Sequence, residues 1–237
     1  MPIENILDNA ACKVKTNNPK LHRWKNWKPN TPFAPVFDVP IWVEDLNTFF
    51  LDPLVQDIED HGSESWYDNA EEFLRSWKRY NIFSWKTEST KFLQHSIARM
   101  YHEYCNALEF PKERPNDLWI KGWAVLLKPG DKISKHSHCY HENAFLSGNL
   151  MVSPNETTTD YDIPHLSHYY GPWKCENKPG RITLFPSWVL HKVEPTEEYR
   201  VSVGFDLFTY HSMEYISKNR DVNSNLQNEI LLSIPLV

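Results

Sequence analysis

The chain of 237 residues is poor in the features that mark several classes of protein. Seven glycines stand against seventeen prolines, so rigid connections are expected rather than flexible Gly-rich linkers. The formal net charge of −6 argues against a general nucleic-acid binder, which would present a basic face. No apolar run approaches the roughly 18 residues that a membrane-spanning helix needs. We therefore expect a folded protein without a membrane segment.

Cysteine is also scarce, and its four positions contain no Cys-x-x-Cys pair. Such a number and spacing does not provide a disulfide framework. The first five residues, Met1 to Asn5, lack the basic and apolar regions of a secretory signal. These observations predict a reducing, cytoplasmic setting.

Hydrophobic residues are plentiful, at 41% of the chain, and aromatic residues reach 14%, which is ample for a packed core. The clearest helix is predicted over residues 88–108, where apolar residues recur at spacings of three and four. Thr87 or Ser89 is expected to cap its N-terminus. We divide this half of the chain into an extended arm, residues 1–36, and a helical layer, residues 37–118.

From residue 119 onward the sequence consists of short strand-like runs separated by turns. Strands without helices between them favour an antiparallel barrel, the double-stranded β-helix or jelly roll. The fold class is therefore predicted as mainly β with an N-terminal helical layer, all in one domain whose core spans residues 119–210. The strand-like runs cover residues 119–127, 132–138, 145–152, 181–185, 188–194 and 199–208.

Two further segments are less regular. Residues 153–179 form a long polar and aromatic connection, a length typical of a functional loop or a lid. Its histidines, His165 and His168, either face a substrate or are solvated. The tail over residues 211–237 ends in an apolar stretch that can dock on the barrel or on another subunit, which would give a homodimer.

Histidines follow glycine turns at two places in the predicted barrel. His136 and His138 come soon after Gly130, and His191 follows Gly180 at a greater distance. Because alternate residues of a strand share one face, His136 and His138 can point into one cavity, where His191 adds a third imidazole. Three such imidazoles make a site for iron, copper, manganese or zinc. For the first two, a pair of surface histidines near a turn is the alternative.

Arg200 and Ser202 occupy alternate positions of a later strand. This pair suits a co-substrate that carries a carboxylate, since the planar guanidinium can hold a carboxylate through two parallel hydrogen bonds. The alternative is a surface arginine that pairs with Glu197 and Glu198.

The barrel region resembles a family of 2-oxoglutarate/Fe(II) oxygenases of bacteria and phages, within the cupin-like double-stranded β-helix superfamily. The resemblance covers about residues 119–208 and is most specific in the second half. It is carried by a Gly-x-x-x-x-Phe-Pro-Ser-Trp-x-x-His-x-Val-x-Pro block at 180–195, by an Arg-x-Ser-x-x-Phe strand at 200–205 and by an Asn-x-Phe-x-Ser-Gly strand at 143–148.

The resemblance implies roles for individual residues. His136 and His191 correspond to the two histidine ligands of Fe(II). Arg200 and Ser202 correspond to the clamp on the far carboxylate of 2-oxoglutarate, the co-substrate, and Asn149 is assigned to the same co-substrate site.

One departure from the family pattern concerns the third ligand. Most of these oxygenases have Asp or Glu two residues after the first histidine, where this chain has His138. Counting from the glycine favours His138 as the ligand. Counting back from Ser147 instead places His141 there, and Glu142 is a further alternative.

The function predicted from the resemblance is an Fe(II)/2-oxoglutarate-dependent oxygenase, a hydroxylase acting on a small-molecule or peptide substrate. The enzymatic alternative is a three-histidine, cupin-type dioxygenase that uses oxygen without 2-oxoglutarate. A non-catalytic β-barrel binding protein is the other alternative, because a histidine replaces the usual carboxylate.

Overall fold

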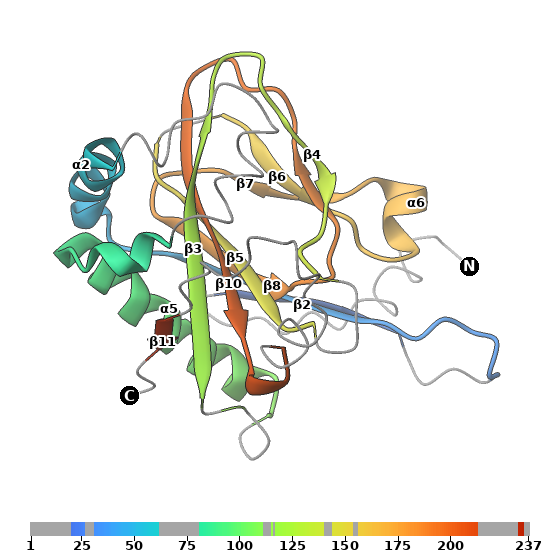
Figure 1. Cartoon of the computed structure of the whole chain (residues 1–237). Coiled ribbons are helices and arrows are strands. Elements are labelled where there is room, and N and C mark those ends of the chain that lie inside the picture. The colour runs from blue at the N-terminus through green and yellow to red at the C-terminus, as the bar shows by residue number, and fades with distance from the viewer. Residues whose placement is uncertain are drawn as a thin grey trace, which may run out of the picture.

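The computed structural model describes residues 20–26, 31–61, 81–110, 115, 117–139, 144–153, 156–212 and 232–234. Two antiparallel β-sheets make up most of this part of the chain, and the longer helices lie along one side of the larger sheet (Figure 1). The prediction of a mainly β protein with a jelly-roll core and a helical layer is confirmed.

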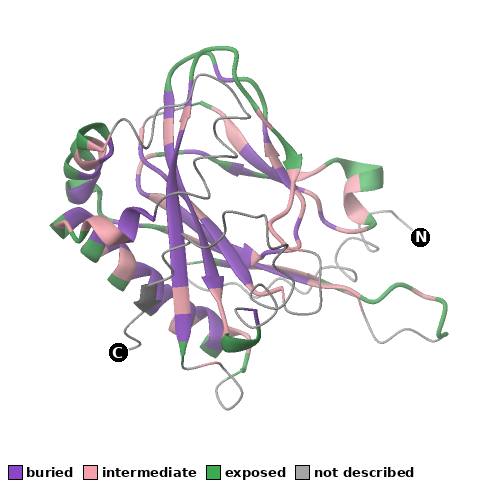
Figure 2. Ribbon diagram, viewed as in Figure 1, coloured by how far each residue is buried: buried purple, intermediate pink, exposed green. Residues whose placement is uncertain are grey.

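The larger sheet has seven strands, and the order of neighbours is β1-β2-β8-β5-β10-β3-β11. Its central strands are buried along most of their length (Figure 2), which explains why their sequences are apolar on both faces. The strands are β1 (Lys20–Lys25), β2 (Asp38–Asp45), β3 (Leu118–Leu127), β5 (Leu146–Met151), β8 (Arg181–Pro186), β10 (Arg200–Phe208) and β11 (Leu232–Ile234).

The smaller sheet has four strands in the order β4-β9-β6-β7. Its strands are short, and β4 and β9 pair with a register shift between Ile133 and His136. The bounds are β4 (Ile133–His136), β6 (Thr158–Tyr161), β7 (Trp173–Glu176) and β9 (His191–Val193).

The helices follow the predicted pattern most closely in α5 (Glu88–Ala107). Thr87 is its N-cap, and the Thr87 side chain accepts a hydrogen bond from the backbone N–H of Thr90. The buried face of α5 packs on the larger sheet and on α2 (Leu51–Asp60). The shorter helices are η1 (Thr48–Phe50), η2 (Ile82–Trp85) and α6 (Leu166–Tyr170).

Two hydrophobic cores result from this arrangement. The larger one lies between the helices and the outer face of the seven-stranded sheet. The smaller one lies between the two sheets and contains Ile41, Tyr161, Phe185 and Val189, each of which is 0% exposed. The second core surrounds the interior on which the candidate site is built.

Three segments differ from the sequence prediction. Residues 38–45 lie in the range predicted as a helical layer but form β2, because Val39, Ile41 and Val43 alternate on the face turned toward the smaller core. Residues 20–25 of the predicted arm form β1, which pairs with β2. The 153–179 connection contains β6, α6 and β7 rather than irregular chain alone.

The described helices contain none that is long and apolar enough to cross a membrane.

Candidate metal centre

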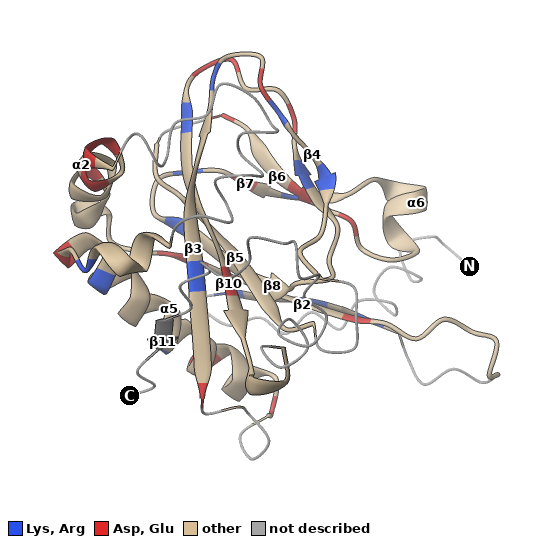
Figure 3. Ribbon diagram, in the orientation of Figure 1, with Lys and Arg blue, Asp and Glu red and all other residues tan. Residues whose placement is uncertain are grey.

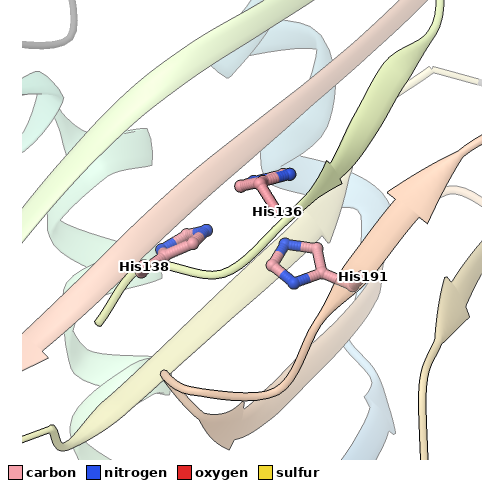
Figure 4. A group of neighbouring side chains, drawn as sticks. All are labelled: His136, His138 and His191. Atoms are coloured by element: carbon pink, nitrogen blue, oxygen red, sulfur yellow. The ribbon is translucent and has the colours of Figure 1, made fainter. Parts of the chain in front are cut away.

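Three histidine side chains converge at the edge of the smaller sheet (Figure 4). Their candidate ligand nitrogens all lie within 4.8 Å of one another. The ring centroids are 4.4 Å apart for His136 and His191, and 5.1 Å apart for His138 and His191. The structure thus brings together all three histidines that the sequence singled out as ligands.

Local backbone structure explains how residues so far apart in sequence meet. His136 ends β4 and lies directly opposite His191, the first residue of β9, so both side chains project from the same face of the sheet. His138 follows β4 in a short extended segment, and its backbone N–H donates to the carbonyl of Ser187 at 2.9 Å. The turn before β9 therefore fixes the position of His138 relative to His191.

Each of the three rings has an oxygen acceptor beside its Nδ1 atom. The Nδ1 of His136 lies 2.9 Å from the carbonyl of Ser134, and that of His191 lies 3.0 Å from the carbonyl of Val189. The Nδ1 of His138 lies 2.5 Å from a carboxylate oxygen of Asp206. A neutral imidazole that donates from Nδ1 carries its lone pair at Nε2, so all three rings are set up to bind an ion through Nε2.

Burial favours the neutral, metal-binding form of two of these rings. The pKa of His191 is lowered well below its ordinary value, mainly because the ring is removed from water and then because His138 and His136 are close. Burial also lowers the pKa of His136, although that side chain lies nearer the surface. Because a histidine must lose its ring proton to bind a metal, these shifts fit a metal site.

The low pKa of His191 predicts how the metal-free protein responds to acid. In the unfolded chain the histidine pKa is about 6.5. The folded state binds a proton less readily than the unfolded state, so stability is highest above about pH 6.5 and falls as the pH drops from there toward the folded pKa. Thermal unfolding at a series of pH values, in the presence of a chelator, should show this loss.

The matched comparison is His191→Asn, which removes this titrating group. Its melting temperature should decline less steeply between about pH 6.5 and 5 than that of the natural chain. Parallel declines would show that other groups account for the acid sensitivity.

A second cluster lies deeper between the sheets, on the face of β10 that carries Arg200 and Ser202. Arg200 is 1% exposed and Ser202 is 0% exposed. Among the described residues, the Arg200 Nε and Nη1 atoms and the Ser202 Oγ atom have no hydrogen-bond partner. Burial lowers the pKa of Arg200 to about 10, and the electrostatic effect of Tyr161 partly offsets this shift. A buried guanidinium with unused donors is costly unless an anionic ligand completes it.

Asn149 lies on the same interior face. It stands opposite Thr183 of β8 on one side and opposite Gly204 of β10 on the other. Along β10, Gly204 lies between Asp206 and Ser202, which share its face of the sheet. This register places Asn149 between the histidines and the buried arginine. His141 and Glu142, the alternatives to His138, fall outside the described residues.

Sequence reasoning missed two residues of this interior, Tyr161 and Asp206. Tyr161 is fully buried, its hydroxyl lies 2.8 Å from the Thr183 hydroxyl, and its ring centroid lies 5.8 Å from that of His191. Asp206 shares the interior face of β10 with Arg200, since the two are separated by an even number of strand positions. That period of two was the available signal for Asp206. Tyr161 lies in the 153–179 connection, which is predicted from its length and polarity to be a functional loop or a lid.

A separate cavity of about 660 Å³ lies beside α6. Its lining includes His165 and His168, together with Trp188 and Lys135. The two loop histidines therefore line a hollow of their own and do not join the three-histidine cluster.

Comparison with known proteins gives one family match. Residues 121–206 match the model of a family described as "Putative 2OG-Fe(II) oxygenase". The matched segment runs from β3 to β10 and includes the three histidines, Arg200 and Ser202. No curated protein sequence matches the chain.

Several solved structures share the fold. A prolyl-4-hydroxylase of Pseudomonas putida is 13% identical with a TM-score of 0.51, covering 72% of this chain and 86% of its own. A Trichoplax adhaerens prolyl hydroxylase, solved with a hypoxia inducible factor peptide, is 12% identical with a TM-score of 0.52. The match covers 76% of this chain and 87% of the hydroxylase. The carbocyclase SnoK from nogalamycin biosynthesis is 8% identical with a TM-score of 0.51. The match covers 82% of this chain and 91% of the carbocyclase.

Proposed function

We propose that this chain, whose residues 121–206 belong to the 2OG-Fe(II) oxygenase family, is a non-haem iron hydroxylase with an all-histidine iron site. In this proposal His136, His138 and His191 hold Fe(II). Arg200 and Ser202 hold the far carboxylate of 2-oxoglutarate. When bound, the iron and 2-oxoglutarate supply oxidation of a substrate C–H bond by oxygen, with 2-oxoglutarate converted to succinate and CO2.

The observation that carries this proposal is the unsatisfied arginine. Arg200 is 1% exposed, and its Nε and Nη1 atoms lack partners among the described residues. Native proteins rarely leave such donors buried without a partner. A dicarboxylate that binds the metal at one end and reaches Arg200 at the other would satisfy them. Ser202 lies two positions after Arg200, and its hydroxyl likewise has no hydrogen-bond partner among the residues that the structure describes, which supports the same interpretation.

The three histidines fit a ferrous ion chemically. Imidazole nitrogen suits Fe(II), and three ligands on one side of an ion leave positions open for a co-substrate and oxygen. The tautomers implied by the Nδ1 contacts and the low pKa of His191 agree with neutral ligands.

The remaining interior residues would position the co-substrate and exclude water from it. The Tyr161 hydroxyl and the Thr183 hydroxyl, which are hydrogen-bonded to each other, lie on the side of the interior toward Arg200. The Phe185 ring packs against His191, with centroids 5.0 Å apart, and the Trp123 ring lies 5.6 Å from His138. Aromatic walls of this kind keep solvent from a reactive centre.

The substrate class in this proposal is a small molecule or a peptide. The structural relatives include a prolyl hydroxylase solved with a peptide and an enzyme of nogalamycin biosynthesis, so the fold accommodates both kinds of substrate. A homodimer formed through the apolar tail over residues 225–237 remains a prediction, because nearly all of that segment lies outside the described residues.

A second candidate function is a three-histidine dioxygenase that does not use 2-oxoglutarate. The observation in its favour is that a third imidazole, His138, stands where the family pattern has a carboxylate. The buried Arg200 argues against it, since such an enzyme needs no anchor for a second carboxylate.

A turnover assay without added substrate separates the two. Many oxygenases that use a co-substrate consume some of it uncoupled from substrate oxidation, so the purified protein with Fe(II), oxygen and 2-oxoglutarate should release succinate. Omission of Fe(II), or His191→Ala, should abolish succinate release. The contrary result is a protein that binds one iron per chain but neither binds nor consumes 2-oxoglutarate, which would favour the three-histidine dioxygenase.

A further inference from the structure

A buried carboxylate lies directly behind one of the three histidines. Asp206 is 5% exposed and comes from β10, a strand of the opposite sheet. Its Oδ1 atom lies 2.5 Å from Nδ1 of His138, and it also accepts a hydrogen bond of 2.6 Å from the Ser147 hydroxyl. In the described part of the chain, the other two histidines have backbone carbonyls in the equivalent place, those of Ser134 and Val189.

This difference coincides with the position where the chain departs from its family. In the usual arrangement, two neutral histidines and one carboxylate bind the ion, and the carboxylate removes one unit of positive charge. Three neutral imidazoles leave that charge in place. The ring that replaces the carboxylate, His138, is also the ring that donates to Asp206. A carboxylate partner holds the ring orientation and raises the basicity of the coordinating nitrogen.

We propose that Asp206 is a positioning residue for the metal, supplying through the His138 ring the negative charge that a directly bound carboxylate supplies in related sites. The inference rests on the proposed Fe(II) site. In this proposal the carboxylate lies one ring farther from the ion, on β10 instead of on the segment that follows β4. Ser147 holds Asp206 in place, because its hydroxyl donates to the same oxygen that accepts from His138.

Another buried charge lies close enough to require a control. Lys121 of β3 stands directly opposite Asp206 in the strand register and is 1% exposed. Figure 3 shows basic positions of the ribbon in blue, including one on β3, and acidic positions in red. Asp206 could therefore serve to balance Lys121 rather than the metal. The two roles differ in what they change: balancing Lys121 affects the metal-free protein, whereas the proposed role affects the binding of the ion.

The test is Asp206→Asn, which keeps the shape and an oxygen acceptor but removes the charge. Competition with a chelator under anaerobic conditions measures the dissociation constant of Fe(II). We expect Asp206→Asn to weaken Fe(II) binding by about 10- to 100-fold and to raise the reduction potential of the bound iron. Ser147→Ala, which removes the other hydrogen bond of Asp206 and leaves its charge, should weaken binding only a few-fold. The Asp206→Asn loss should persist in a Lys121→Met background.

A double substitution gives a result that a merely structural role would not produce. His138→Asp places a carboxylate directly at the ion, where it faces Asp206 across a short distance. The aspartate has no ring that could pass the charge of Asp206 on to the ion, so in this background Asp206→Asn should weaken Fe(II) binding by much less than the roughly 10- to 100-fold expected when His138 is present. Most of the effect of Asp206→Asn should thus depend on the His138 ring. If His138→Asp does not fold, the reduction potential and affinity of the single variant decide the question.

The outcomes distinguish this inference from the proposed function. Unchanged Fe(II) affinity and potential in Asp206→Asn, together with loss of iron in His191→Ala, would overturn the role of Asp206 and leave the metal site standing. Disappearance of the Asp206→Asn effect in the Lys121→Met background would assign Asp206 to Lys121 instead. A natural chain that binds no Fe(II) would overturn both.

Discussion

His191→Ala is expected to abolish stoichiometric Fe(II) binding while the protein stays folded. His191 is the most buried of the three histidines, at 8% exposed, and it is the one whose pKa burial lowers most clearly. Removing a direct ligand should cost more than the roughly 10- to 100-fold that loss of an outer partner costs. Iron analysis after anaerobic loading measures the stoichiometry, and circular dichroism measures the fold.

The fold should survive because the strands around His191 do not depend on the ion. The smaller sheet is held by the pairing of β9 with β4 and with β6. The adjacent core of Ile41, Tyr161, Phe185 and Val189 is formed by apolar packing. His168→Ala, in the cavity beside α6, is the matched control and should retain one iron per chain. Full iron content in the His191→Ala protein would refute the three-histidine site.

The sequence predicted the helix and the barrel strands well where the local pattern was strong. The helix α5 begins at the predicted residue, because Thr87 is an ordinary N-cap and the apolar residues after it recur at helical spacing. The strands β3, β5, β8 and β10 lie within a residue or two of their predicted ranges. In each case apolar or alternating residues are bounded by turn residues, so the information is local.

The prediction failed where pairing between distant segments determines the structure. Residues 38–45 contain a proline and lie in the range predicted as helical, yet they form β2 because β8 on one side and β1 on the other complete their hydrogen bonds. The strand β6 was missed because two threonines and an aspartate made it look like a polar loop. Its Tyr161 is buried only once β7 and β9 pair with it. Tertiary context overrides such weak local signals.

In the candidate site, too, local features could be predicted from the sequence, whereas contacts between distant segments could not. The positions of His136 and His138 after a glycine turn, and the alternation of Arg200 with Ser202, are local features. The structure brings the two histidines together with His191 and buries Arg200 and Ser202. Asp206 acquires meaning only when β10 is laid opposite the segment that carries His138. No periodicity in either segment could have indicated that contact, because it links the two sheets.

Arg200→Met is expected to weaken 2-oxoglutarate binding by about ten- to a hundredfold. Hydrogen bonds between a guanidinium and a carboxylate contribute roughly 1.5–3 kcal/mol, and each 1.4 kcal/mol is a factor of ten in affinity. Methionine fills much of the same volume without donors or charge. Isothermal titration of the metal-loaded protein with 2-oxoglutarate measures the change, and Fe(II) affinity should be unaltered because Arg200 is not a ligand in this site.

The same substitution should act in the opposite direction on the stability of the ligand-free protein. Burial lowers the pKa of Arg200 to about 10, and its Nε and Nη1 atoms have no partner in the described part of the chain. Replacing an uncompensated buried cation by an apolar side chain of similar size is commonly neutral or stabilising. The melting temperature of Arg200→Met should therefore equal or exceed that of the natural chain without co-substrate. At the same concentration, 2-oxoglutarate should raise the melting temperature of the natural chain more than that of Arg200→Met.

A second arginine, whose charge is already paired, provides the control for both measurements. Arg181 on β8 is partly buried and forms an ion pair with Asp45, so Arg181→Met should leave 2-oxoglutarate affinity unchanged. A role for Arg200 in folding alone would lower the melting temperature of Arg200→Met and spare co-substrate affinity. Equal 2-oxoglutarate affinity in Arg200→Met and the natural chain would rule out the anchor, and the buried arginine would then need another anion to explain its place between the sheets.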